Sequence, residues 1–378
     1  MPEPASPIRV LIACPGLGIA ERGFERVASD WFRSLRDRPE LEMRLVKGRG
    51  PAGDAELTVP TIARDARISK LVGRLLGRHE FWLEQVVFSA SLQPVLTRLR
   101  PDVVLLSEWA LAGALGRLRH LTRGRFKIVL CNGAPGDPPF PRGVDHVLQV
   151  TPVYLERALD RGEPEDRQTL LPHAFHIPSN WSPPSRAERA ALRRRLRLPL
   201  DRPVLLTVGA LNMWHKRMDY MIDEVASLGE GRPHLAMLGA REPETAAVLA
   251  RAAERLGADG FSAETVAEHE VTDYYRAADV FALASGFEGF GLVLVEALAQ
   301  GLPVLAQDSP SSRFVTGGHA YLADFTKPGE LARLFGSLDE GDAIGQRGAK
   351  RHLYTYESFS WDALGPRYVE ALERVAHG

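Results

Sequence analysis

Cysteine is scarce in this sequence of 378 residues, and the long apolar runs of membrane proteins are missing. Its two cysteines, Cys14 and Cys131, are too few for the disulfide framework that stabilises many small secreted domains. Neither they nor the 11 histidines have the spacing of metal ligands, so no metal site is expected. No uncharged stretch approaches the roughly 20 residues of a membrane span, and the N-terminal residues lack a signal-peptide pattern. These absences predict a soluble, cytoplasmic protein.

An excess of charge of one sign is also missing. Lysine and arginine number 47 against 48 aspartates and glutamates, so nothing in the overall charge favours nucleic acid as a partner. Tandem repeats and low-complexity tracts are missing too. The composition, 45% hydrophobic and 25% charged, is typical of globular proteins, and the length is sufficient for two domains.

The most informative stretch spans residues 278–307. An apolar run at 280–283 has the length of a strand, a helix is expected from Phe290 to Gly301, and a second strand at 303–306 follows. The junction before the helix is rich in glycine, which lets backbone N–H groups at a helix N-terminus meet an anion. Phosphate is the anion that we expect such a junction to bind.

Two glutamates make this stretch more specific. Glu288 precedes the expected helix, and Glu296 lies on it, nearly two turns beyond Phe290. Carboxylates accept strong hydrogen bonds from sugar hydroxyls. The alternative is an ordinary turn residue and a helical residue favoured by the helix dipole.

Four short motifs characterise this region: EGFGL at 288–292, EALA at 296–299, GLPV at 301–304 and, upstream, YRAAD at 275–279. With these motifs the region resembles the nucleotide-sugar region of retaining glycosyltransferases of the GT-B fold, specifically glycosyltransferase family 4 (glycosyl transferases group 1). This resemblance implies an α/β protein with two Rossmann-like domains whose parallel sheets face an interdomain cleft.

Three segments are expected from this resemblance. Residues 1–175 would form the acceptor-binding domain, and residues 176–355 would form the nucleotide-sugar domain. Residues 356–378 would form a C-terminal helix that returns to the first domain.

The resemblance also implies a function. It predicts a retaining, metal-independent hexosyltransferase that needs no cofactor and moves a sugar from a UDP- or GDP-linked donor. The acceptor would be a hydroxyl of a small molecule, a glycan or a lipid. Catalytic roles are expected for Glu288, which would bind the donor sugar, and for Lys216, which would bind the diphosphate. The expected donor-binding residues are Gly16, Gly18, Gly209, Lys216, Arg217, Val266, Glu288, Gly289, Phe290, Gly291, Leu292 and Glu296.

One departure from the family pattern concerns the diphosphate site. Lys216 is offset by one extra residue, and Ala210 stands where the family has an arginine. Either Arg217 or His215 would compensate for the missing cation, or Arg217 merely begins a surface helix. The departure leaves an alternative open, in which a catalytically degenerate protein binds a sugar nucleotide or acts as a scaffold for a partner transferase.

The N-terminal half alternates expected strands and helices, beginning with strands at 8–13 and 41–46 and a loop at 47–60. Gly16 and Gly18 follow the first strand and would either approach a phosphate or form a tight turn. Glu108 and Asn132 follow later strands and are expected on the acceptor side of the site. The family often has a histidine near the position of Asn132, so an acid or base role there is in doubt.

Residues 62–78 form a basic amphipathic pattern with apolar residues at helical spacing. Two readings compete. Such a helix lies on an anionic bilayer as a peripheral membrane contact, or it buries its apolar face in the protein. A further helix at 81–99 is expected to break at Pro94. The oligomeric state is not predicted.

Overall fold

The computed structural model describes residues 6–19, 23–62, 66–77, 81–122, 126–133, 139–339, 342 and 346–378. The chain divides into two compact units. The first comprises Met1–Phe175 together with Ser360–Gly378, and the second comprises His176–Phe359. Each unit has one parallel sheet and a hydrophobic core of its own.

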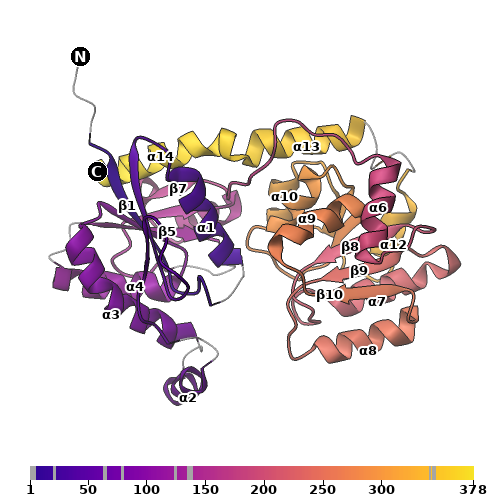
Figure 1. The fold of residues 1–378 in the computed structure, drawn as a ribbon, viewed down its shortest axis with the longest axis horizontal. Helices are drawn as coiled ribbons and strands as arrows, with labels where there is room; N and C mark the ends of the chain where they lie inside the picture. The colour runs from indigo at the N-terminus through magenta and orange to yellow at the C-terminus, as the bar shows by residue number, and fades with distance from the viewer. Residues whose placement is uncertain are drawn as a thin grey trace. The chain divides into compact units, whose positions relative to one another are not determined.

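The first unit is built on a sheet of seven strands in the order β3-β2-β1-β4-β5-β6-β7 (Figure 1). The strands are β1 (Ile8–Cys14), β2 (Leu41–Lys47), β3 (Glu56–Thr58), β4 (Val103–Leu106), β5 (Lys127–Asn132), β6 (His146–Gln149) and β7 (Gln168–Leu170). The helices are α1 (Gly23–Leu35), α2 (Arg67–Leu76), α3 (Phe81–Leu99), α4 (Trp109–Leu118), α5 (Pro152–Asp160) and α14 (Trp361–His377), with short 3₁₀ turns η1 (Arg119–Thr122) and η2 (Glu165–Arg167).

The second unit is built on six parallel strands in the order β10-β9-β8-β11-β12-β13. They are β8 (Val204–Val208), β9 (His234–Leu238), β10 (Phe261–Glu264), β11 (Val280–Leu283), β12 (Val304–Gln307) and β13 (Tyr321–Ala323). The helices are α6 (Arg186–Leu196), α7 (Met218–Ser227), α8 (Thr245–Leu256), α9 (Glu268–Ala277), α10 (Leu292–Ala299), α11 (Pro310–Thr316), α12 (Glu330–Gly336) and α13 (Gln346–Phe359), with the 3₁₀ turn η3 (Gly229–Gly231).

The central strands form because their sequences are apolar on both faces. β4 reads VVLL and β11 reads VFAL, and every residue of both strands is buried. Parallel sheets are covered by helices on both sides, which requires such uninterrupted apolar runs. In the first unit, α3 buries Phe88, Leu92 and Leu96 in the core, while α14 lies beside α1 (Figure 1).

Three local expectations are wrong. Residues 47–60 are not all loop, because β3 pairs with β2 there through a short edge ladder. The helix at 81–99 is not broken at Pro94, since buried Leu92 and Leu96 hold the turns on both sides of the proline. The helix expected from Phe290 begins at Leu292, after Gly291 in the left-handed conformation. Among the described residues, no helix is long and apolar enough to cross a membrane.

Candidate functional site

The order of strands in the second unit reverses between β8 and β11. From β8 the chain builds outward through β9 and β10, and it then returns to pair β11 with the other side of β8. In open parallel sheets, ligands bind beyond the carboxyl ends of the strands at such a switch point. The two loops that meet there follow Val208 and Leu283.

The loop after β8 is shaped by a buried asparagine. The side-chain oxygen of Asn212 accepts hydrogen bonds from the backbone N–H groups of His215 and Lys216, at 3.2 and 2.8 Å. Its amide nitrogen donates to Glu242 at 2.8 Å, and Asn212 is only 1% exposed. Asn212 therefore fixes the backbone from which the Lys216 side chain extends. Sequence reasoning missed this residue, because its role depends on Glu242, 30 residues away.

Lys216 and Glu288 form an ion pair across the switch point. The Lys216 Nζ donates to Glu288 Oε1 at 2.5 Å, and the two side chains are 14% and 16% exposed. A Cβ atom built on Gly209 would lie 3.0 Å from Lys216 Cδ, so the glycine leaves room for the lysine stem. The structure thus brings together the two residues for which catalytic roles are expected.

A second link between the same loops comes from aromatic residues. The His215 ring stacks on Phe287 with centroids 4.2 Å apart, and its Nε2 donates to the Phe287 carbonyl at 3.0 Å. Burial, and then the charge of Lys216, lower the pKa of His215 below its ordinary value of 6.5. Trp214 lies 64% exposed beside both rings. The ion pair therefore sits next to an aromatic cluster whose imidazole favours the neutral form.

Arg217 is the residue before helix α7 and has a left-handed backbone conformation, with φ of 53°. Its guanidinium lies over the ring of Tyr220, 4.6 Å from the centroid. The side-chain stem also passes the loop after β11, since a Cβ built on Gly286 would lie 3.9 Å from Arg217 Cδ. These contacts do not test whether Arg217 replaces the diphosphate-binding arginine that the family has at the position of Ala210, so this role stays a prediction.

The loop after β11 leads into α10 through two buried residues and then a glycine with positive φ. Gly289 and Phe290 are buried, and the Phe290 ring packs edge-on against Phe359 at 5.8 Å. Gly291, with φ of 90°, precedes the first helical residue, Leu292. Positive φ at this junction favours glycine because a side chain would be strained there. The junction places the N-terminus of α10 directly after the Glu288 loop.

Glu296 lies on α10 and faces helix α9. Its Oε2 accepts a hydrogen bond from the Tyr275 hydroxyl at 2.8 Å, and Tyr275 is 2% exposed. Val266 lies elsewhere, just past the carboxyl end of β10, where Thr265 donates to the carbonyl of Gly239 at 2.7 Å. The edge strand β10, which Val266 follows, lies two strands away from β8.

The first unit has its own switch point, between β1 and β4. Gly18 follows β1 with φ of 82°, and a Cβ there would lie 2.2 Å from the Arg49 carbonyl oxygen. Glycine is therefore required at position 18 because the backbone of Arg49 lies too close for a side chain. Gly16 accepts from the N–H of Ile19 at 2.9 Å, within the same turn.

Asn132 ends β5, Glu108 lies two residues beyond the end of the neighbouring strand β4, and both are buried. Glu108 accepts from the Cys14 thiol at 3.7 Å, and burial together with Glu108 raises the pKa of that thiol well above its ordinary value. Asn132 donates to Gln149 at 2.9 Å, and its side-chain oxygen has no hydrogen-bond partner among the described residues. Cys131 is also a buried free thiol.

A histidine that sequence reasoning missed lies beside Gly133, the residue that follows Asn132. His173 follows β7 and is 5% exposed, and its Nε2 would lie 3.0 Å from a Cβ built on Gly133. Burial lowers the pKa of His173 to about 4. The loop after β5 therefore has an imidazole at its side, supplied by a different strand.

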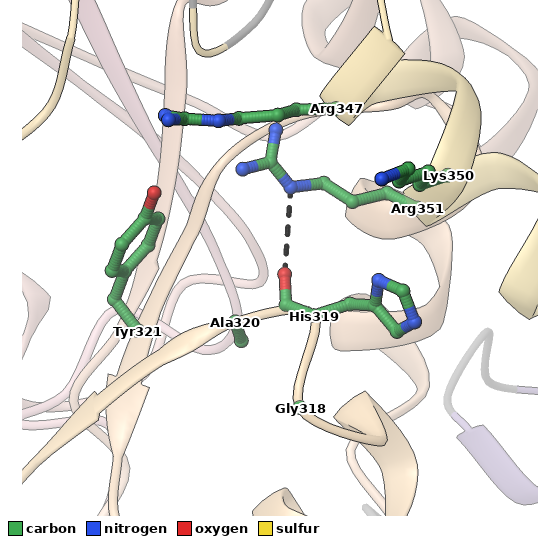
Figure 2. Close-up of a pocket in the computed structure, with 7 residues that line it drawn as sticks. All are labelled: Gly318, His319, Ala320, Tyr321, Arg347, Lys350 and Arg351. Atoms are coloured by element: carbon green, nitrogen blue, oxygen red, sulfur yellow. Dashed lines mark hydrogen bonds between the residues drawn. The ribbon is translucent and has the colours of Figure 1, made fainter.

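A basic pocket of about 200 Å³ lies in the second unit at the amino end of the edge strand β13 (Figure 2). Arg347 and Arg351 line it, but both are paired with carboxylates. Arg351 contacts Asp342 at 2.5 Å, and Arg347 contacts Asp339 at 2.9 Å. The residues expected to bind the donor follow the carboxyl ends of the strands, so this pocket is separate from them.

Comparison with known proteins supports a family relationship. The family model of glycosyl transferases group 1 matches residues 202–338. A D-inositol 3-phosphate glycosyltransferase from Thermobispora bispora is 37% identical over 317 residues, which are 73% of this chain and 72% of that protein.

Two solved structures show similarity along nearly the whole chain. A sucrose-phosphate synthase from Thermosynechococcus elongatus has a TM-score of 0.76 at 16% identity, covering 97% of this chain and 99% of that one. HepE from Anabaena, in complex with UDP-glucose, has a TM-score of 0.75 at 15% identity, with the same coverage. The expected α/β architecture with two Rossmann-like domains is confirmed.

Proposed function

Because this chain belongs to the glycosyl transferases group 1 family and has the GT-B fold, we propose that it transfers a hexose-type sugar from a UDP- or GDP-linked donor. The acceptor is a hydroxyl of a small molecule, a glycan or a lipid. The observation that carries the proposal is the Lys216–Glu288 ion pair at the switch point between β8 and β11. The name of the Thermobispora relative supports sugar transfer, and the UDP-glucose in the HepE structure supports a nucleotide-linked donor.

Lys216 stabilises the leaving diphosphate in this proposal. Negative charge develops on the phosphate as the sugar–phosphate bond breaks, and a fixed cation in a partly dehydrated site stabilises that charge more strongly than water does. Without donor, Glu288 neutralises the Lys216 ammonium, and both side chains are largely shielded from solvent. A bound donor supplies each of them with a new partner, diphosphate for the lysine and sugar hydroxyls for the glutamate.

The remaining donor contacts follow from the elements around the pair. The N-terminus of α10, at Gly291 and Leu292, binds a phosphate oxygen through backbone N–H groups. Glu296, which accepts a hydrogen bond from Tyr275, binds the ribose hydroxyls through its carboxylate. Val266 offers backbone groups to the nucleobase.

The proposed reaction retains configuration, as in glycosyltransferase family 4. The acceptor hydroxyl forms a new bond to the anomeric carbon on the face from which the diphosphate departs. The bond from that carbon to the phosphate oxygen breaks, and the hydroxyl proton passes to a phosphate oxygen. Lys216 and the α10 N-terminus supply positive charge, so the proposal includes no metal and no cofactor. Glu108 and Asn132 of the first unit contact the acceptor.

Calorimetric titration with UDP, GDP, ADP and TDP tests the donor site. We expect wild-type protein to bind one of them with micromolar affinity and Lys216→Met and Glu296→Ala to bind it at least about tenfold more weakly. With the matching sugar nucleotide and an acceptor, Lys216→Met should lower kcat about 100-fold or more. The control is Arg251→Met, which breaks the exposed pair with Asp223 and should change neither quantity. Equal binding by wild type and both site variants would contradict the proposal.

A catalytically degenerate protein is the second candidate. Ala210 in place of the family's arginine favours it, because one cation for the diphosphate is missing. Nucleotide binding that depends on Lys216, without sugar transfer to any acceptor and without donor hydrolysis, would identify this candidate.

The cytoplasmic location expected from the sequence remains a prediction.

A further inference from the structure

Helix α2 packs against the protein with its smallest side chains. Of its ten residues, only Ser69 and Gly73 are buried, and the helix contacts α3. These two residues are four apart, so they lie about 40° apart around the helix axis. The attachment of α2 to α3 therefore uses a narrow face without large apolar residues. Residues 63–65 and 78 of the predicted amphipathic segment lie outside the described part of the chain.

The large apolar residues of α2 point to solvent instead. Ile68, Leu71, Leu75 and Leu76 are 53%, 58%, 75% and 55% exposed. This arrangement contradicts the reading in which the helix buries its apolar stripe in the protein. Single exposed leucines are ordinary on protein surfaces. Ile68, Leu71 and Leu75, however, lie within about 60° of one another around the axis of α2 and form one apolar patch, which points to an interaction site. Leu76 lies near the side of Ser69 and is not part of this patch.

Basic residues border this patch on the same helix. The sequence RISKLVGRLL contains Arg67, Lys70 and Arg74 and no acidic residue. Leu71 lies about 160° from both Ser69 and Gly73, which puts it opposite the face that contacts α3. Arg67 and Arg74 flank Leu71 on one side, and Ile68 and Leu75 flank it on the other. The outward side of α2 is therefore half apolar and half cationic.

We propose that α2 docks on the surface of a lipid bilayer that contains anionic headgroups. The helix lies in the interface with Leu71, Leu75 and Ile68 among the acyl chains and its basic residues against the lipid phosphates. Ten residues rise only about 15 Å, which fits a helix lying along the surface and not one that spans the bilayer. This inference does not rest on the proposed sugar transfer.

Charge complementarity favours a bilayer over a second copy of this chain. A symmetric dimer through α2 would place the same patch on both partners, so Arg67, Lys70 and Arg74 would meet their own copies. Juxtaposed like charges disfavour such an interface. An anionic lipid surface satisfies the basic and the apolar residues at once.

Co-sedimentation of the full chain with vesicles tests the proposal. The vesicles contain either phosphatidylcholine alone or phosphatidylcholine with 30% phosphatidylglycerol as the probe of anionic lipid, a fraction chosen as roughly that of an anionic leaflet. We expect wild-type protein to bind the mixed vesicles and not the neutral ones. The variants Leu71→Ser/Leu75→Ser and Lys70→Glu/Arg74→Glu should each bind the mixed vesicles at least about tenfold more weakly.

Two control variants match these changes at other exposed positions. Leu121→Ser/Leu353→Ser removes two leucines that are 60% and 52% exposed, and Arg186→Glu/Arg194→Glu reverses two charges on the arginine-rich helix α6. Both controls should bind like wild type, and circular dichroism should show that all four variants fold. Failure of wild type to bind mixed vesicles would overturn the proposal, as would equal loss in variants and controls. A dimer in sedimentation velocity that only Leu71→Ser/Leu75→Ser disrupts, without vesicle binding, would make the patch a protein interface instead.

Discussion

Burial keeps the imidazole of His173 uncharged in the folded protein. The side chain packs beside Gly133 at the carboxyl edge of the first sheet, and its pKa falls to about 4 from an ordinary value near 6.5. The unfolded chain therefore takes up a proton between these two values, while the folded chain does not. Stability that is present above pH 6.5 is lost as the pH falls toward 4.

Replacing His173 should weaken this dependence on pH. In wild type, we expect His173 to lower the free energy of unfolding by about 2 kcal/mol between pH 7 and pH 5. His173→Asn removes the titrating group, so its free energy of unfolding should fall less over the same interval, whatever its value at pH 7. Urea unfolding at several pH values measures the slope.

The exposed residue His176 provides the matched control. His176→Asn should keep the wild-type slope. If His173→Asn and wild type had the same slope, the imidazole would not be held neutral by burial.

At this scale, the sequence predicts residue types better than residue contacts. The family resemblance of short motifs predicts roles for Lys216 and Glu288, and the structure joins the two across 72 positions. The roles of Asn212 and His173 are not predictable in this way, because an asparagine in a loop and a histidine after a strand give no local signal. Each acts through a neighbour that only the folded sheet brings close.

Among the elements, β8 and β9 meet most tightly where they end. Gly239 follows β9, and a Cβ there would lie 1.7 Å from the Gly209 carbonyl oxygen and 2.5 Å from its carbon. The two glycines thus let neighbouring strands end side by side at the switch point. The Gly209 loop is also the one against which Lys216 lies.

Gly239→Ala should therefore force the ends of β8 and β9 apart. We expect it to lower the free energy of unfolding by about 2–4 kcal/mol, since only backbone atoms stand in the way and none of them can rotate aside. Gly231→Ala is the control, because a Cβ there has no atom within 4 Å among the described contacts, and its effect should stay within about 0.5 kcal/mol. Thermal and urea unfolding measure both. Equal stability of the two variants would show that the strand ends adapt at no cost.

Strongly apolar strands were predictable, and short edge strands were not. The expected strand at 280–283 coincides with β11, whereas β3 lies within the segment 47–60 that is expected to be a loop. Edge strands such as β3 and β10 are partly exposed. Their sequences lack the continuous apolar run that marks a central strand, so pairing with an existing sheet determines them.

Across the whole molecule, the last helix belongs with the first half of the sequence. In α14, Tyr368 is fully buried, and its hydroxyl donates to the Pro172 carbonyl at 2.9 Å. The backbone N–H of Trp361 donates to the Phe175 carbonyl at 3.0 Å. The chain thus crosses twice between units, near 175 and near 360.

Deleting residues 360–378 should destabilise the first unit and spare the second. The deletion removes the buried side chains of Tyr368 and Leu372 from the first unit and leaves the core of the second unit intact. Hydrogen exchange should rise in β1 and β4 and remain slow in β8 and β11. Deleting only the exposed residues 377–378 is the control and should leave exchange unchanged in both sheets. Faster exchange in all four strands would show that the two units do not unfold separately.

The position of α14 also sets the order in which the protein can mature on the ribosome. Domains usually fold from the N-terminus as they emerge during synthesis. Here residues 176–359 are all made before the helix that completes the first unit. Until residues 360–378 are made, the surface of the first unit that α14 covers stays exposed, whereas the second unit already has its full sequence. The unit that begins first is therefore finished last, and its uncovered apolar surface is where a chaperone would bind the growing chain.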